Sequence, residues 1–125
     1  MPRDVTRFSA QLAQHMNDLS QLEVVEAAED VVRRRHLQLL NSELAGLTDD
    51  LAVAQRHLSA ARKGDDLAYI INTEEQVCGI LRQTTIMQRQ AGEHIRAFKH
   101  ARDVYLTRRD WLVARIDQLR RLVAG

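Results

Sequence analysis

The sequence predicts an all-α protein, built as a long two-helix antiparallel coiled-coil hairpin with a turn near residue 64. Three observations predict this fold: few helix breakers, apolar residues at heptad spacing, and helix stop and start signals at the centre of the chain. The 125 residues include one proline and five glycines, and 4% of them are aromatic. This composition is typical of long helices and coiled coils rather than of a compact globule.

The first half of the chain carries an apolar stripe that alternates in steps of three and four residues. Such steps keep one face of a helix apolar and predict a coiled-coil seam. Between residues 23 and 36 the heptad fails, and Val25, Ala28 and Val32 take over in a shifted register, which we interpret as a stutter. The regular stripe consists of Phe8, Leu12, Leu19 and Leu22, and then of Leu37, Leu40, Leu44, Leu47, Leu51, Ala54, Leu58 and Ala61.

The second half shows the same helical spacing. We therefore expect one domain over residues 1–125, with a first helix over about 4–62, a turn at 63–66 and a second helix over about 67–123. The apolar positions of the second helix are Leu67, Ile70, Val77, Leu81, Met87, Ala91, Ile95, Phe98, Tyr105, Leu112, Ile116, Leu119 and Val123.

Residues 62–66 predict the turn by local chemistry. Arg62 and Lys63 suit a last helical turn, and Gly64 follows where a left-handed conformation ends many helices. Asp65 or Asp66 is a good N-cap for the next helix. One continuous helix that passes over a glycine is the alternative, because other glycines lie inside the helical pattern.

The charge pattern favours a chain that reverses. If the turn lies near residue 64, residue i lies beside roughly residue 129 minus i, because both helices rise equally per residue. Residues 17–32 hold five acidic residues and no Lys or Arg, whereas residues 96–121 hold eight Lys or Arg residues and three aspartates. Opposite charges beside the seam select an antiparallel hairpin. A three- or four-helix bundle, broken also at residues 45–50 and near Gly92, is the alternative.

No motif of an enzyme or of a cofactor site is present. The sequence has no glycine-rich phosphate loop and no nucleophile elbow, and a pair of helices offers no cleft that desolvates a base. The hairpin register places His36 near His94 and Glu93; we interpret the two histidines as solvated rather than as a metal site. We expect no catalytic residue, no cofactor and no metal.

Charge and hydropathy also limit the partners. The net charge of +1 is weak for nucleic-acid binding, and the basic run "VVRRRH" (31–36) has no aromatic neighbours. No apolar segment is long enough to span a membrane, so we expect a cytoplasmic protein without membrane insertion. The single Cys78 lies in an apolar stretch and is expected to be a small buried hydrophobic residue.

The segment "YLTRRDWLVARIDQLRR" (105–121) carries apolar residues outside the seam, at Leu106, Trp111 and Val113. Either a dimer or bundle with a wider core covers them, or arginine and tryptophan form a docking surface, where both residue types are enriched. Tyr69, Ile70 and Ile71 raise the same question near the turn.

Three segments carry a resemblance to a known family: "LSQLEVVEAAEDVVRRR" (19–35), "AYIINTEEQV" (68–77) and "RRDWLVARIDQLRRL" (108–122). In this layout the chain resembles the FliJ/YscO-like family of stalk proteins in type III secretion and flagellar export. The resemblance implies a non-enzymatic stalk, similar to the coiled coil of a rotary ATPase, that links the hexameric export ATPase to the cytoplasmic ring of the export gate and binds secretion chaperones. Such a stalk is cytoplasmic or peripheral at the inner membrane.

The resemblance also implies two groups of binding residues. Tyr69, Ile70 and Glu74 would face the gate. The group that faces the ATPase would consist of Arg108, Arg109, Trp111, Arg115, Arg120 and Arg121. Two other functions stay open: a self-assembling helical adaptor such as a dimeric four-helix bundle, and a chaperone-like or antitoxin-like partner that folds when bound.

The antiparallel register predicts which positions crosslink. Cysteine pairs at positions 51 and 78, or 25 and 104, allowing a slip of a few residues, should crosslink within one chain, because both pairs add up to 129. Mass spectrometry of the crosslinked protein tests this register, and crosslinks found only between chains would contradict it.

Overall fold

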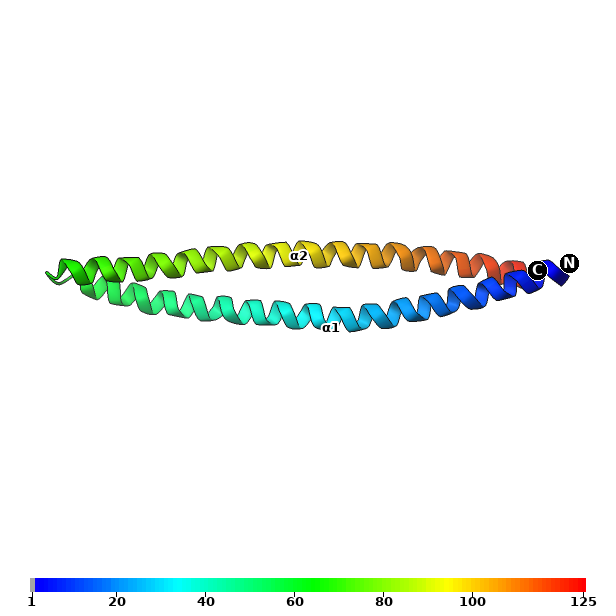
Figure 1. Ribbon diagram of the computed structural model, residues 1–125, viewed down its shortest axis with the longest axis horizontal. Helices are drawn as coiled ribbons and strands as arrows, with labels where there is room; N and C mark the ends of the chain where they lie inside the picture. The colour runs from blue at the N-terminus through cyan, green and yellow to red at the C-terminus, as the bar shows by residue number, and fades with distance from the viewer. Residues whose placement is uncertain (1) are drawn as a thin grey trace. The chain divides into compact units, whose positions relative to one another are not determined.

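The computed structural model describes residues 2–125, with side chains from Asp4 onward. Helix α1 spans Pro2–Ala61 and helix α2 spans Leu67–Ala124. They pack against each other as a helical hairpin (Figure 1). The all-α hairpin with a turn near residue 64 is therefore confirmed. Both helices continue without a break through residues 45–50 and through Gly92, so the described chain is not a three- or four-helix bundle.

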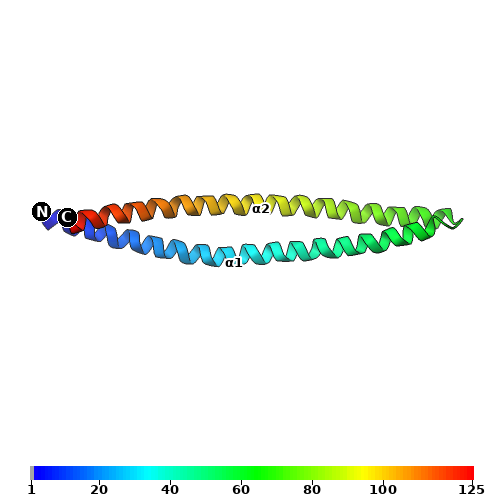
Figure 2. The same cartoon turned by 180° about the vertical axis from the view of Figure 1, so that it is seen from behind.

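The chain divides into two compact units, each with a stretch of both helices. Unit 1 comprises Met1–Arg33 and Ala97–Gly125, and unit 2 comprises Arg34–Arg96. Within each unit the two stretches lie side by side and run in opposite directions, as the views from the front and from behind agree (Figures 1 and 2). The division in α1 falls inside residues 23–36, where the apolar heptad fails.

The seam of unit 2 follows the predicted stripe on α1. Leu40, Ala54, Leu58 and Ala61 are buried, and the other leucines of the stripe are half-buried. On α2 the prediction is wrong at three positions, because Leu67, Leu81 and Ile95 are exposed. The regular three- and four-residue steps instead place Thr73, Ile80, Thr84 and His94 in the seam. Here polar residues occupy seam positions, and the apolar residues beside them gave a misleading pattern.

The two seam threonines show how α2 tolerates polar residues at its packed face. Thr73 is buried, and its hydroxyl donates to the carbonyl of Tyr69 at 2.8 Å. Thr84 donates to the carbonyl of Ile80 at 2.8 Å. A hydroxyl that bonds to the carbonyl four residues earlier needs no partner across the seam. Threonine can therefore replace an aliphatic residue there.

The seam of unit 1 has an apolar part at Leu112–Leu119 and an ionic part at Glu26–Arg33 and Arg102. Leu112, Ile116 and Leu119 on α2 are buried, as predicted. Within residues 23–36, however, Val25 and Val32 are 53% and 68% exposed, so the predicted apolar stripe does not lie in the seam. A different set of side chains takes the inward positions there: Glu26 is buried, and Asp30 and Arg33 are half-buried.

The seam residues Leu22, Glu26 and Asp30 follow one another at two successive intervals of four residues. This spacing is that of a stutter, which the sequence predicted at this place.

The turn follows the predicted order of signals with one difference. The amides of Lys63 and Gly64 donate to the carbonyls of Ala60 and Ala61, three residues earlier, at 3.2 and 3.0 Å. These tight bonds end α1 by narrowing its last turn. Gly64 has no positive φ, so the predicted left-handed conformation is wrong.

Asp66 is the N-cap of α2. Its Oδ1 accepts a hydrogen bond from the amide of Tyr69 at 3.1 Å, and its carbonyl accepts one from the amide of Ile70 at 3.0 Å. Of the two aspartates left open by the sequence, Asp66 therefore starts the helix.

Cys78 is exposed, which contradicts the prediction of a buried residue. It directly follows Val77, which is half-buried in the seam. Successive residues of a helix are rotated by about 100°, since 3.6 residues complete a turn. The thiol therefore lies off the seam despite its apolar sequence neighbours.

We expect Asp66→Ala to lower the free energy of unfolding by about 0.5–2 kcal/mol, because the amide of Tyr69 loses its cap. Urea unfolding followed by circular dichroism measures this change. Asp65→Ala is the matched control, with the same charge change one residue away, and should stay within about 0.5 kcal/mol of the parent chain. Equal losses in both variants would show that charge rather than capping matters.

Candidate docking surfaces

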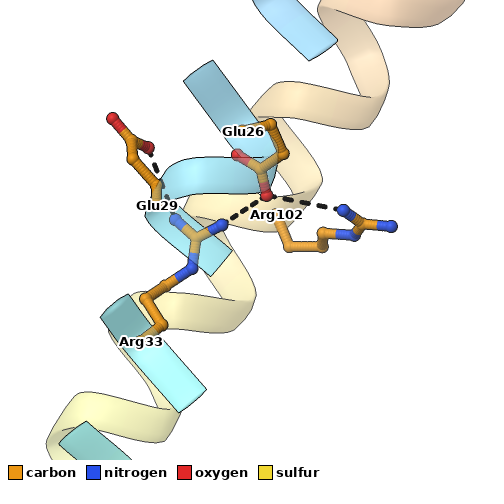
Figure 3. Close-up of polar contacts among 4 residues, drawn as sticks. All are labelled: Glu26, Glu29, Arg33 and Arg102. Atoms are coloured by element: carbon orange, nitrogen blue, oxygen red, sulfur yellow. Dashed lines mark hydrogen bonds and ion pairs between the residues drawn. The ribbon is translucent and has the colours of Figure 1, made fainter. Parts of the chain in front are cut away.

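Glu26 is the centre of an ionic cluster in the seam of unit 1 (Figure 3). Its Oε1 accepts a hydrogen bond from Arg33 of the same helix, and Nη1 of Arg102 on α2 lies 3.4 Å from the same oxygen. Arg33 also reaches Glu29, with Nη1 and Oε2 3.5 Å apart. The side chains of Glu26 and Arg33 are 8% and 12% exposed, so this ion pair is largely withdrawn from water.

The contact between Glu26 and Arg102 confirms the pairing of an acidic with a basic stretch. A second cross-helix pair supports it, because Nε of Arg109 lies 3.6 Å from Oε1 of Glu23. Both pairs obey the register in which the residue numbers add up to about 129. Exposed ion pairs contribute little to stability, but charges beside a seam fix which positions face each other. The acidic stretch of α1 therefore lies beside the basic stretch of α2 in a defined register.

The arginines predicted to face an ATPase differ in their surroundings. Arg108 and Arg120 are exposed, whereas Arg109 is half-buried and held by Glu23. Arg115 donates to Oε1 of Gln118 at 2.8 Å. Arg121 lies 3.3 Å from Oδ2 of Asp117, one turn away on the same helix. The group therefore lies within unit 1, but Arg109 is committed to the hairpin itself.

Trp111 is 58% exposed and lies beside Arg108 in a shallow hollow of about 560 Å³ on α2. His100, Val104 and Thr107 also line this hollow. The indole makes a T-shaped contact with His15 of α1, with ring centroids 5.6 Å apart and planes at 87°. The contact holds the ring in place while much of its surface stays in water. A fixed, exposed Trp beside an Arg is a typical interface anchor.

The residues predicted to face an export gate lie in unit 2, near the start of α2. Tyr69 is 50% exposed, whereas Ile70 is half-buried in the seam. Glu74 is half-buried and is bound by Arg62 of the turn, with Nη2 and Oε1 3.3 Å apart. The structure thus places the two predicted groups in different units. Tyr69 is the member of this group with the most accessible surface.

His36 and His94 meet across the helices of unit 2, as the hairpin register predicts. Their ring centroids are 4.4 Å apart and their planes are at 76°. Both residues are half-buried, so the expectation of two solvated histidines is wrong in this respect. Among the described residues, no group of three or more His, Cys, Asp or Glu side chains could hold a metal ion.

One surface of unit 1 was missed as a site by the sequence argument. Ala28 and Val32 of α1 and Phe98 and Ala101 of α2 line an apolar hollow of about 480 Å³, which we name the Phe98 groove. Its signal was present, because Ala28 and Val32 belong to the stripe that was assigned to a shifted seam. An apolar stripe with this spacing can face the other helix or the solvent. Because Glu26 takes the inward position, the stripe with Ala28 and Val32 faces outward.

No protein-family model matches the chain, and no curated protein or solved structure is significantly similar to it. Over the described residues, neither helix has a stretch apolar enough to cross a membrane. The surfaces themselves are therefore the basis for a functional proposal.

The Glu26 cluster can be tested by removing its charges singly and together. Glu26→Gln should lower the free energy of unfolding by about 1–3 kcal/mol, because Arg33 and Arg102 lose the poorly hydrated carboxylate that they share. The double variant Glu26→Leu with Arg33→Met should recover most of this loss, since an apolar pair suits the seam. Urea unfolding measures both values. Glu29→Gln, at the exposed partner of Arg33, is the control, and a double variant weaker than Glu26→Gln would contradict this account.

Proposed function

We propose that this chain is a non-enzymatic central-stalk component of a type III protein export apparatus, which links the export ATPase to the export gate. The observation that carries the proposal is the exposed arginine and tryptophan surface on the C-terminal stretch of a two-helix hairpin. The resemblance of residues 19–35, 68–77 and 108–122 to the FliJ/YscO-like family supports it. In this role the protein acts in the cytoplasm, or at the inner membrane through the apparatus.

The ATPase-facing surface consists mainly of arginine side chains that make no ion pair with the described part of α1. Arg108 and Arg120 are exposed, and Trp111 is fixed by His15 but largely uncovered. Arg115 donates a hydrogen bond to Gln118, and Arg121 forms an ion pair with Asp117; both partners lie on α2 itself. Long arginine side chains suit a contact inside a six-fold ring, because they adjust to several positions of the surrounding subunits. Arg109 instead stabilises the pairing with Glu23.

The gate-facing surface lies near the start of α2. Tyr69 supplies a half-exposed aromatic ring, and Glu74 supplies a carboxylate held by Arg62. Ile70 supports this surface from its half-buried position in the seam. Secretion chaperones are a further class of partner that this role includes.

A self-assembling helical module is the second candidate, and the Phe98 groove favours it. Its apolar residues lie beside Glu29 and Arg33, which pair with each other at 3.5 Å. A second copy could therefore cover the groove without meeting an uncompensated charge. A dimeric four-helix bundle would result.

The stalk proposal predicts loss of ATPase stimulation when arginines of this surface other than Arg109 change sign. Arg108, Arg115 and Arg120 should be replaced together by glutamate, which leaves the pair of Arg109 and Glu23 intact. We expect stimulation of the cognate export ATPase to be abolished while circular dichroism stays helical. Stimulation by the parent chain should also fall with salt, because the Debye length shrinks from about 10 Å at 0.1 M to about 3 Å at 1 M.

The matched control is glutamate at Arg56, Arg82 and Arg89, which are exposed in unit 2. It makes the same change in net charge and should preserve stimulation. Tyr69→Ser should preserve stimulation as well and weaken binding to the gate ring. Normal stimulation by the first triple variant would overturn the stalk proposal. A dimer in sedimentation that Val32→Glu disperses would favour the self-assembling module instead.

A further inference from the structure

A groove in unit 2 lies beside the seam and is lined by both helices. It consists of two hollows of about 540 and 470 Å³, which share Asp50 and Gln83 and are therefore continuous. On α1 the groove follows Glu43, Gly46, Asp50, Val53 and His57, in steps of three and four residues. We name it the Gly46 groove. Its spacing is that of a second heptad stripe beside the seam, which is how a helix in a bundle contacts two neighbours.

The lining of the Gly46 groove combines polar side chains with apolar ones that are partly uncovered. Ile86 is 53% exposed and Val53 is 42% exposed. Leu47 and Met87 are half-buried and add apolar surface from the edge of the seam. Side chains of this kind gain most from a partner that removes them from water. A partner that covers the groove would therefore gain hydrophobic free energy from apolar surface that the hairpin does not bury.

Two glycines make the Gly46 groove deeper than the seam requires. Gly46 and Gly79 lie inside helices, where glycine is unfavourable compared with alanine. A Cβ added at either position would meet nothing within 4 Å, so the packing of the chain does not call for glycine there. Glycine on a helix surface lets another helix approach closely. Both glycines line this one groove.

The charges of the groove have one sign. Glu43 and Asp50 are exposed, lie one heptad apart on α1, and make no ion pair or side-chain hydrogen bond within the part of the chain that the structure describes. No Lys or Arg lines either hollow, although the chain contains 18 of them. The charge pattern thus calls for a basic occupant.

A second copy of the chain is a poor occupant. Two-fold pairing brings the same surface patch of both copies together, so the carboxylates of Glu43 and Asp50 would lie opposite the same two residues of the other copy. Like charges placed opposite each other across helices destabilise the contact. The Phe98 groove of unit 1 has no such pair of like charges. We therefore expect the Phe98 groove to accept a second copy of the chain and the Gly46 groove to accept a different partner.

We propose that the Gly46 groove binds a basic amphipathic helix of another protein. The stretch from Glu43 to His57 is about 21 Å long at 1.5 Å per residue, so it accommodates about four turns. The bound helix presents apolar residues at steps of three and four to Ile86 and Val53. It carries Lys or Arg residues one heptad apart, which meet Glu43 and Asp50. This proposal does not depend on the export function.

The test uses two fluorescent 21-residue synthetic peptides, both with leucine at the a and d positions of three heptads. One has lysine at all e and g positions and the other has glutamate there. Fluorescence anisotropy with the full chain should show at least tenfold tighter binding of the lysine peptide. Glu43→Lys with Asp50→Lys should reverse this preference. Binding of neither peptide, or equal binding of both, would overturn the proposal.

Two further variants separate the groove from general charge. Asp49→Lys with Glu75→Lys makes the same charge change at exposed residues outside the groove and should leave the preference unaltered. Gly46→Leu with Gly79→Leu should fill the groove, retain helical circular dichroism and reduce binding of the lysine peptide at least tenfold. The proposal is wrong if the control variant reverses the preference as well. It is also wrong if filling the groove dissociates a dimer of the chain but spares peptide binding.

Discussion

A pair of packed helices buries one stripe of each helix, and the other features of this chain follow from that limit. Among the described residues, seven hydrophobic side chains are buried, whereas eighteen large ones are at least 42% exposed. The seam therefore cannot account for the apolar surface that the sequence carries. Part of this exposed apolar surface lines the named hollows: Val32 lies in the Phe98 groove, Val53 and Ile86 lie in the Gly46 groove, and Val104 and Trp111 line the hollow on α2. Binding is the function that such a distribution favours.

The ionic cluster around Glu26 fixes the register of the two helices in unit 1 more than it adds to their stability. Glu26 takes an inward position, and the attraction of Arg33 and Arg102 offsets the cost of withdrawing its carboxylate from water. A slip of α2 by one turn would leave that carboxylate without Arg102. Leucines alone would tolerate such a slip better, because one apolar contact resembles the next. The polar residues thus restrict the hairpin to a single alignment.

The fold was predictable because its signals are periodic, and the errors occur where a polar residue interrupts the period. Leu40 to Ala61 gave the correct seam, and Asp66 caps α2 as the local chemistry indicates. His94 and Glu26 lie in the seam, but hydropathy favoured Ile95 and Val25 beside them. The site residues were less predictable, since the sequence does not reveal that Arg109 is occupied by Glu23. The Gly46 groove was hidden because open space beside a glycine is a property of packing.

Cys78 adds a reactive group to the surface of α2. The thiol is exposed and precedes Gly79, a residue of the Gly46 groove. Since the chain has no second cysteine, oxidation by air can join it only to another molecule. Two chains joined by a Cys78 disulfide would then form a dimer without any affinity between their helices, and a reductant would separate them. The same thiol accepts a single maleimide dye, whose emission would report on water beside the groove.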